Sequence, residues 1–150
     1  MSITRGLPLA VLAVLAATNA LASDTRVALV PGGPHPYFAA WEQAAAAASA
    51  DFGIEAAYRV PQAWELSRQN EMIESLVAQG FNAVLVFPGD AVGTNATLQE
   101  LHDFGIPTAA LAGCTVDPTA ASFCLGTDVA RSAYLGTKEL IDALGGQGRI

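Results

Sequence analysis

Basic residues are scarce in this sequence. Its 150 residues include 7 Lys and Arg against 14 Asp and Glu, which gives a formal net charge of -7. The few basic residues are scattered along the chain, whereas a nucleic-acid-binding surface needs them clustered on one face. The same acidity disfavours an anionic membrane surface. We therefore expect neither nucleic acid nor anionic lipid as a partner.

Motifs for catalysis and cofactor binding are also missing. No Gly-x-Gly-x-x-Gly follows the first apolar run, no Gly-Lys-Ser/Thr phosphate loop occurs, and no Ser lies in a nucleophile-elbow context. The only two histidines, His35 and His102, show no metal-ligand spacing with the scattered carboxylates. His102 also lies far in the pattern from Cys114, so a Cys-His catalytic pair is disfavoured. These absences predict a protein that is not an enzyme and has no cofactor or metal.

The amino-terminal apolar run, Leu7 to Ala17, is too short to span a bilayer, which takes about 20 apolar residues. Arg5 precedes this run, and residues 20–22 (Ala-Leu-Ala) fit a small-x-small cleavage pattern. Residues 1–22 are therefore predicted to be a signal peptide, with a mature chain that begins at Ser23. A retained membrane anchor is the alternative. No Cys follows the run, which disfavours a lipid anchor, so we expect an exported protein without membrane insertion after signal removal.

Cysteine is also rare, and export gives the two cysteines a meaning. In an oxidising compartment a lone pair such as Cys114 and Cys124 usually forms a disulfide. Closing a loop of about 11 residues would stabilise the fold by roughly 3 kcal/mol in the chain-entropy model. Two free thiols are the alternative, and a metal pair without histidine partners is a further one.

The composition that remains is that of a folded domain with a core, at 52% hydrophobic and 14% charged residues. After the signal peptide, β- and α-type patterns alternate at intervals of about 25 to 30 residues. This alternation predicts one α/β domain over residues 23–150, with a parallel, doubly wound sheet and a crossover after each strand. The last residue, Ile150, looks like the start of another strand. The expected strands are 26–30, 55–60, 83–87, 107–112 and 123–126, and the expected helices are 36–52, 65–79, 94–104 and 128–144.

The most informative stretch is Val27 to Trp41. An apolar strand pattern ends at a Pro/Gly turn, and His35, Tyr37 and Phe38 follow it at the start of an alanine-rich helix. Ligands of open α/β sheets bind outside the carboxyl ends of the strands. We therefore expect these three side chains to contact a ligand. Alternatively, His35 caps the turn or the helix, and Phe38 packs against the sheet.

Two further candidates follow later strands. Trp64 lies in the turn after the second expected strand, and Asp90 follows the third. Surface packing is the alternative for Trp64, and capping of the next helix is the alternative for Asp90. Trp41 and Asp128 are secondary candidates, because Trp41 also suits packing at the core or rim and Asp128 suits a helix cap or a hinge.

These residue types suit a neutral polyhydroxylated ligand. Such a ligand needs flat apolar surfaces for its C–H groups and directional donors and acceptors for its hydroxyls. Tyr37, Phe38 and Trp64 supply the first, and His35, Asp90 and the Tyr37 hydroxyl supply the second. A mostly aromatic lining with a few polar groups is the usual form of a small-molecule site.

Four short motifs, in order, resemble those of the type I periplasmic solute-binding proteins of ABC transporters, the ribose- and galactose-binding family. His35-Pro-Tyr-Phe38 lies where the family has Asn-Pro-aromatic-aromatic. Residues 73–90 resemble the family's helix, its Gly-x-Asp/Asn-Ala turn and a buried strand that ends in Pro-x-Asp. Gly105-Ile-Pro107 and Gly126-Thr-Asp128 are similar to two further signatures. The resemblance extends from about residue 26 to 150.

The resemblance implies a protein whose two α/β lobes close on a sugar or polyol and then dock on a membrane permease. It implies that residues 23–150 form the first lobe and the start of the crossing into a second lobe, with truncation before that lobe. Where many members have an Asp-Arg pair after the fourth strand, this sequence has Ala112-Gly113 and then Cys114. A family Asn is replaced by His35, and another near Trp64. The sequence thus predicts a more aromatic, less charged pocket than the family's usual one.

The leading functional hypothesis is a monomeric periplasmic binding protein that delivers a sugar, sugar alcohol or similar small polar solute to an ABC import permease. A periplasmic sensor subunit that presents its ligand to a chemoreceptor or histidine kinase is the main alternative. An exported flavodoxin-like enzyme is a distant one. The sugar-responsive repressors of this fold are disfavoured because they begin with a basic helix-turn-helix, whereas this chain begins with the signal-peptide pattern.

Overall fold

Five parallel strands form a single sheet in the order β2-β1-β3-β4-β5. A computed structural model describes residues 24–117, 119–147 and 149. The predicted signal peptide (1–22) and the strand expected to begin at Ile150 lie outside these residues. The strands are β1 (Arg26–Val30), β2 (Glu55–Tyr58), β3 (Ala83–Val86), β4 (Thr108–Ala112) and β5 (Phe123–Gly126).

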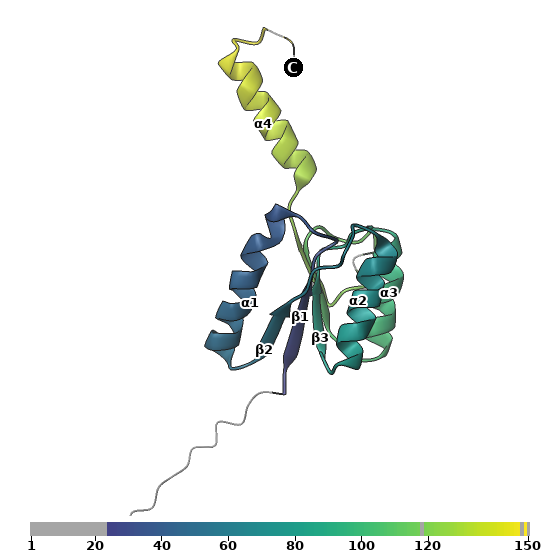
Figure 1. Ribbon diagram of the computed structural model, residues 1–150. Helices are drawn as coiled ribbons and strands as arrows, with labels where there is room; N and C mark the ends of the chain where they lie inside the picture. The colour runs from purple at the N-terminus through teal and green to yellow at the C-terminus, as the bar shows by residue number, and fades with distance from the viewer. Residues whose placement is uncertain (1–23, 118, 148, 150) are drawn as a thin grey trace, which may run out of the picture.

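The helices cover both faces of this sheet, so the predicted doubly wound α/β fold is confirmed. A 3-10 turn, η1 (Pro36–Phe38), leads into α1 (Ala39–Phe52) on one face, and α2 (Leu66–Ala78) and α3 (Gly93–Asp103) lie on the other (Figure 1). The chain moves outward from β1 to β2 and then back across to β3 and β4. Because parallel crossovers are right-handed, this reversal moves the later helices to the opposite face. The reversal places a topological switch point between β1 and β3.

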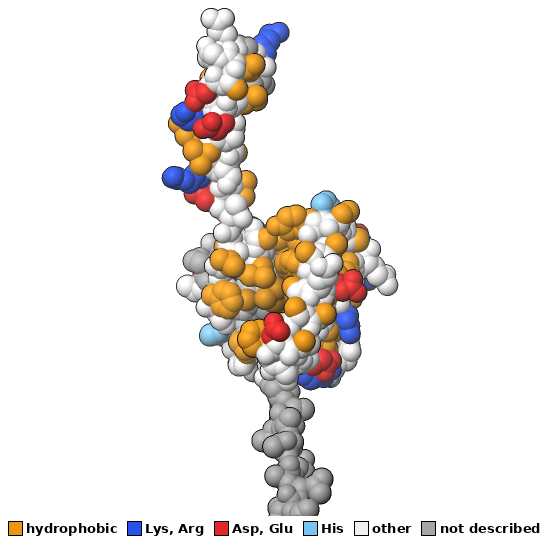
Figure 2. All heavy atoms as spheres, turned by 90° about the vertical axis from the view of Figure 1, so that its left-hand side faces the viewer, with side chains coloured by type: hydrophobic (Ala, Val, Ile, Leu, Met, Phe, Trp, Pro, Cys, Tyr) orange, Lys and Arg blue, Asp and Glu red, His pale blue; other side chains and the backbone are white. Residues whose placement is uncertain are grey.

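The main core lies between the sheet and the pair α2 and α3. Alternate strand residues such as Val84 and Val86 face Ile73 and Leu76 of α2 and Leu98 of α3, and all five are buried. The face toward α1 is less completely covered. Phe123 and Leu125 of β5 are exposed, and apolar side chains gather across the side of the molecule that bears α1 (Figure 2). The strands are therefore held mainly by the core on the side of α2 and α3.

Helix α4 (Val129–Ala143) extends away from the sheet, and none of its residues is buried (Figure 1). Its exposed apolar side chains include Tyr134, Leu135, Leu140 and Ile141. Within the residues that the structure describes, no helix is both long enough and apolar enough to cross a membrane.

Several sequence predictions differ from the structure in detail. The second strand ends at Tyr58 rather than residue 60, because Arg59 donates the last hydrogen bond to Leu29 and Pro61 follows. The first helix opens as the η1 turn before it becomes α-helical at Ala39. The connection from β4 to β5 is a loop over residues 113–122 without a helix in its described part, in agreement with the sequence pattern, which predicts no helix there. Asp117 folds this loop by accepting hydrogen bonds from Thr119 at 2.9 and 2.6 Å.

The predicted disulfide is confirmed. Cys114, just after β4, is bonded to Cys124 within β5, and their Cα atoms lie 5.8 Å apart. The bond closes the loop between two adjacent strands and so replaces the tether that a crossover helix would give. Gly126 lies beside it, and a Cβ at that position would lie 2.8 Å from the Cys114 sulfur.

Candidate functional site

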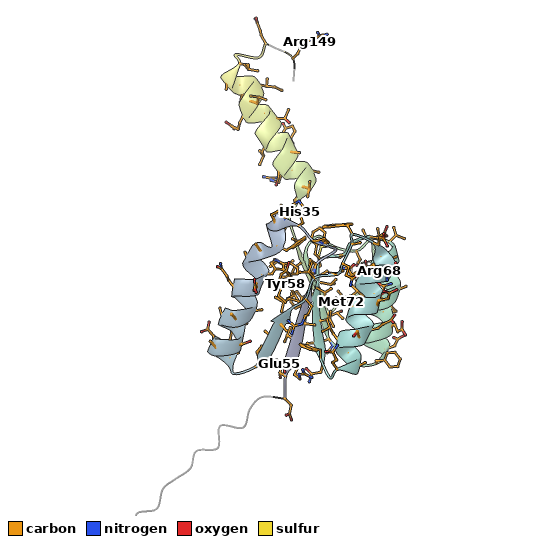
Figure 3. All side chains as sticks on the ribbon, in the orientation of Figure 1. His35, Glu55, Tyr58, Arg68, Met72 and Arg149 are labelled. Atoms are coloured by element: carbon orange, nitrogen blue, oxygen red, sulfur yellow. A yellow bond between two sulfur atoms is a disulfide. The ribbon has the colours of Figure 1, made fainter. Side chains whose placement is uncertain are left out.

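Five rings form a pocket at the carboxyl ends of the three neighbouring strands β2, β1 and β3. Its volume is about 250 Å³. The chain reaches it three times, directly after each strand, on both sides of the switch point between β1 and β3. Figure 3 shows His35 at this end of the molecule and Glu55, at the start of β2, at the other end. We call this site the aromatic pocket, and it is lined by His35, Tyr37, Phe38, Trp64 and Phe87.

His35 shapes the first part of the aromatic pocket. Its Nδ1 accepts a hydrogen bond from the Tyr37 backbone N–H at 3.1 Å, and it is the N-cap of η1, with Pro36 at the first position of the turn. In a neutral imidazole whose Nδ1 accepts, Nε2 carries the hydrogen. The cap that the sequence predicted as an alternative role is therefore present. It leaves one ring N–H as a donor for the pocket.

Phe38 is the packing centre of the pocket. Its side chain is 1% exposed, and its ring centroid lies 5.0 Å from that of Tyr37, 5.1 Å from Phe87 and 5.2 Å from Trp41. These are edge-to-face arrangements, the favoured geometry of aromatic pairs. The Phe38 ring also lies 6.1 Å from that of Trp64, and Tyr37 and Trp64 are 61% and 47% exposed. Their accessible surfaces are available to a ligand.

Trp64, in the loop after β2, packs against the turn of Gly32 and Gly33 that follows β1. A Cβ at Gly32 would lie 2.9 Å from Cζ2 of the Trp64 ring, and one at Gly33 would lie 2.7 Å from the Trp64 Cα. Only glycine therefore permits this approach of the two loops. The indole N–H donates to the Gly89 carbonyl oxygen at 3.3 Å, which ties the loop after β2 to the loop after β3.

Gln69, in α2, forms hydrogen bonds with the backbone of two loops beside the aromatic pocket. Sequence reasoning did not identify this role. The side chain is fully buried, and its Nε2 donates to the carbonyl oxygens of Pro31 at 3.0 Å and Phe87 at 2.7 Å. Its Oε1 accepts from the Gly89 N–H at 3.0 Å. One amide thus joins the chain after β1 to the chain after β3. The signal in the sequence was a glutamine in line with the inward apolar positions of a helix, at the spacing of Leu66 and Ile73.

Phe87 was also missed as a site residue, because the sequence pattern placed it inside the third strand. The structure ends β3 at Val86, so Phe87 is the first residue beyond the strand, at the carboxyl edge. Its ring lies 5.8 Å from that of Trp64. Its position at the end of a strongly apolar run was the available signal.

Three other predicted site residues lie outside the aromatic pocket. The Asp90 Oδ1 accepts from the N–H groups of Val92 and Gly93 at the start of α3, and the Asp128 Oδ1 accepts from Arg131 N–H at the start of α4. Trp41 packs against Phe38 and, at 6.5 Å, against Tyr58. The two carboxylates therefore serve as helix caps, which were their alternative roles.

The electrostatics of the pocket are simple. With His35 neutral, none of its five lining side chains carries a formal charge.

Outside the pocket, next to Trp41, burial and then the negative charge of Glu42 raise the pKa of Tyr58 above its ordinary value. Among the described residues, no three His, Cys, Asp or Glu side chains gather in a way that would hold a metal ion. The arrangement can therefore bind an uncharged molecule through ring surfaces and a few directed hydrogen bonds.

The end of β4 borders the same edge. Ala112 has φ of 60°, a left-handed conformation that costs a non-glycine residue energy, and Gly113 follows it. A Cβ at Gly113 would meet the Phe87 ring at 3.4 Å. The position where the sequence lacks an Asp-Arg pair thus extends the apolar edge beyond Phe87.

Comparison with known proteins gives one family match and several structural neighbours. The sequence profile of the periplasmic binding protein domain matches residues 27–150. A search of curated protein sequences gave no match to this chain.

The structural neighbours share the fold at low sequence identity. An ABC transporter solute-binding protein from Burkholderia graminis, solved in complex with D-arabinose, is 23% identical, with a TM-score of 0.77 over 85% of this chain and 44% of its own. A periplasmic solute-binding protein from Actinobacillus succinogenes with bound D-allose is 23% identical, with a TM-score of 0.72 over 83% of this chain and 46% of its own. The fructose-binding periplasmic domain of a hybrid two-component system is 14% identical, with a TM-score of 0.74 over 83% and 41%.

The sequence thus spans less than half the length of these solved proteins. The family is one of binding proteins rather than enzymes, and the structural neighbours include sugar-binding proteins of ABC transporters. The resemblance predicted from the four sequence motifs is confirmed over residues 27–150: the chain belongs to the periplasmic binding protein domain family.

Proposed function

We propose that this chain supplies one wall of a cleft that binds a neutral sugar or sugar alcohol in the periplasm, and that the protein hands the solute to an ABC import permease. The observation that carries this proposal is the aromatic pocket at the switch point of the sheet. Tyr37 and Trp64 present accessible ring surface there, and His35 presents an N–H. Ring faces match the C–H surfaces of a sugar, and the N–H matches a hydroxyl oxygen.

The open side of the pocket also fits this proposal. Small-molecule sites bury most of their ligand, whereas Tyr37 and Trp64 are about half exposed. The solved proteins with this fold are more than twice as long as the stretch that they share with this chain. We propose that a second lobe closes over the pocket, and that the protein acts as a monomer during binding.

Calorimetric titration of the full-length mature protein with neutral sugars and polyols tests the proposal. We expect binding of at least one of them, and Tyr37→Ala and Trp64→Ala should each weaken it about tenfold or more because each removes a stacking surface. Phe104→Ala is the matched control, since Phe104 is 73% exposed at the far end of α3. Binding of charged amino acids alone, or equal losses in all three variants, would refute the carbohydrate assignment.

A sensor role is the second candidate, favoured by the structural likeness to a fructose-binding domain of a two-component system. In that case the closed protein would contact a receptor or histidine kinase instead of a permease. Uptake of labelled ligand by cells that lack the gene distinguishes the two roles. Loss of uptake supports transport, whereas unchanged uptake with loss of a transcriptional response to the sugar supports sensing.

A further inference from the structure

The aromatic pocket offers few partners to the hydroxyl groups of a ligand. Two of its five lining side chains, His35 and Tyr37, belong to exposed residues and carry polar atoms. Trp64 carries a third polar group, but its indole N–H is already given to the Gly89 carbonyl oxygen. Phe38 and Phe87 carry none. The side chains therefore supply one N–H and one phenolic hydroxyl.

Several backbone groups around the pocket are already paired. Backbone groups at loop ends often bind sugar hydroxyls when they are free, and four of those near Trp64 and Phe87 have a partner within the protein. The Pro31 and Phe87 carbonyl oxygens accept from Gln69, and the Gly89 N–H donates to it. The Gly89 carbonyl oxygen accepts from Trp64. A hydroxyl at this part of the wall would find the Gly89 N–H taken and each of these carbonyl oxygens already accepting one hydrogen bond.

Two charged side chains that follow the strands, Asp90 and Arg59, already have partners within the protein. Asp90 caps α3 through its Oδ1. The Arg59 guanidinium donates to the Tyr58 carbonyl oxygen and borders a separate hollow beside Glu42 and Glu55. After β4, Ala112 and Gly113 bring no polar side chain at all to the edge beside Phe87. The wall formed by Trp64 and Phe87 thus has no free polar side-chain atom of its own, and His35 and Tyr37 are the other polar side chains of the pocket lining.

From this accounting we infer that the ligand is a deoxy sugar, with a methyl or methylene group where an ordinary sugar has a hydroxyl, and that this group lies against Phe87 and Trp64. The inference rests on the proposed function and specifies its substrate class. A hydroxyl buried without a hydrogen-bond partner is expensive, whereas a methyl group gains from the same contact. The wall therefore discriminates against the parent sugar more than it attracts the deoxy sugar.

Pairs of sugars that differ by a single hydroxyl provide the test. The full-length mature protein is titrated calorimetrically with L-rhamnose and L-mannose, L-fucose and L-galactose, 6-deoxy-D-glucose and D-glucose, and 2-deoxy-D-ribose and D-ribose. In the pair that binds most tightly, the deoxy member should bind at least about tenfold more tightly than its parent. A parent sugar that binds equally or more tightly in that pair overturns the inference and leaves the proposed function intact. The absence of binding by any neutral sugar or polyol overturns both.

Substitutions at the wall show whether these rings set the preference. Phe87→Leu and Phe87→Gln both remove the ring and are alike in size, but only Gln offers hydrogen bonds. The ratio of the deoxy sugar's affinity to that of its parent sugar should be unchanged in Phe87→Leu. It should fall severalfold in Phe87→Gln, because the extra hydroxyl of the parent sugar can then form a hydrogen bond with the glutamine amide. Trp64→Leu and Trp64→Gln repeat the comparison at a half-exposed position, where folding is less at risk. Equal ratios in the Leu and Gln variants at both positions would overturn the assignment of the preference to this wall.

Discussion

The side-chain nitrogen of Gln69 lies 2.7 Å from the carbonyl oxygen of Phe87, at the base of the aromatic pocket. The same nitrogen donates to the Pro31 carbonyl oxygen, and the amide oxygen accepts from Gly89. One buried side chain of α2 thus joins the segments that follow β1 and β3, two of the three strands whose ends carry pocket side chains. Removing that amide would leave buried backbone groups on both ends without partners.

Gln69→Leu should therefore lower the free energy of unfolding by about 2 to 4 kcal/mol, because lost partners for buried polar groups cost roughly 1 to 3 kcal/mol each and partial relaxation recovers some of it. Urea denaturation followed by circular dichroism measures the change. Gln62→Leu is the matched control, since Gln62 is exposed in the loop before α2, and it should change stability by less than about 0.5 kcal/mol. Similar losses in both variants would contradict the role given to Gln69.

Gly33→Ala should displace Trp64. The new Cβ would lie 2.7 Å from the Trp64 Cα, closer than non-bonded atoms approach, so one of the two loops must move. We expect a loss of about 1 to 3 kcal/mol in stability and a red shift of tryptophan fluorescence as the indole becomes more exposed.

Gly136→Ala is the control for this substitution. Gly136 lies within α4 and has open space at the Cβ position, so alanine there should stabilise the helix slightly, by up to about 1 kcal/mol. An unchanged fluorescence spectrum and melting temperature in Gly33→Ala would show that the loops after β1 and β2 are not in tight contact.

The pair of Arg26 and Glu55, at the opposite end of the strands, should make stability depend on pH. The guanidinium binds both carboxylate oxygens, at 2.6 and 2.9 Å, and this hydrogen bonding lowers the pKa of Glu55. A carboxyl group with a lowered folded-state pKa stabilises the fold above its unfolded pKa of about 4.3, and this contribution disappears as the pH falls through the folded value. Because both side chains are accessible to solvent, the effect is modest.

Glu55→Gln should accordingly lower the melting temperature near pH 7 and flatten its decline between about pH 5 and 3. Glu74→Gln, on the exposed surface of α2, removes an equal charge and serves as the comparison. The same acid profile in wild type and Glu55→Gln would mean that the pair adds nothing to stability.

Loss of the disulfide should destabilise the β4–β5 edge. The bond joins Cys114 to Cys124 across a sequence separation of 10. In the chain-entropy model, opening such a loop costs roughly 3 kcal/mol. The double variant Cys114→Ala/Cys124→Ala should therefore melt at a lower temperature, and reductant should lower the melting temperature of wild type but not of the double variant. A wild-type protein with two titratable thiols before reduction would contradict the bond.

The arrangement of the sheet was predictable because apolar runs such as 83–87 and the turns that end them are local signals. The same runs placed His35, Tyr37 and Phe38 at the edge where ligands bind, and the structure brings these three together with Trp64. Gln69 and Phe87 were missed because their roles depend on partners far away in the sequence: Gln69 binds carbonyl groups of residues 38 and 18 positions distant. Asp90 illustrates the converse. A carboxylate after a strand suits both a ligand and a helix cap, and only the positions of the Val92 and Gly93 N–H groups show that it caps.

The burial of Phe38 has a consequence for the energetics of recognition. Its ring is enclosed by those of Tyr37, Trp41, Trp64 and Phe87. Side chains that are free before binding lose about 0.5 to 1.5 kcal/mol each in conformational entropy when a ligand immobilises them. Here folding itself has already restricted these rings. For the proposed solute, contacts among the rings before binding would therefore reduce the entropy lost on ordering them.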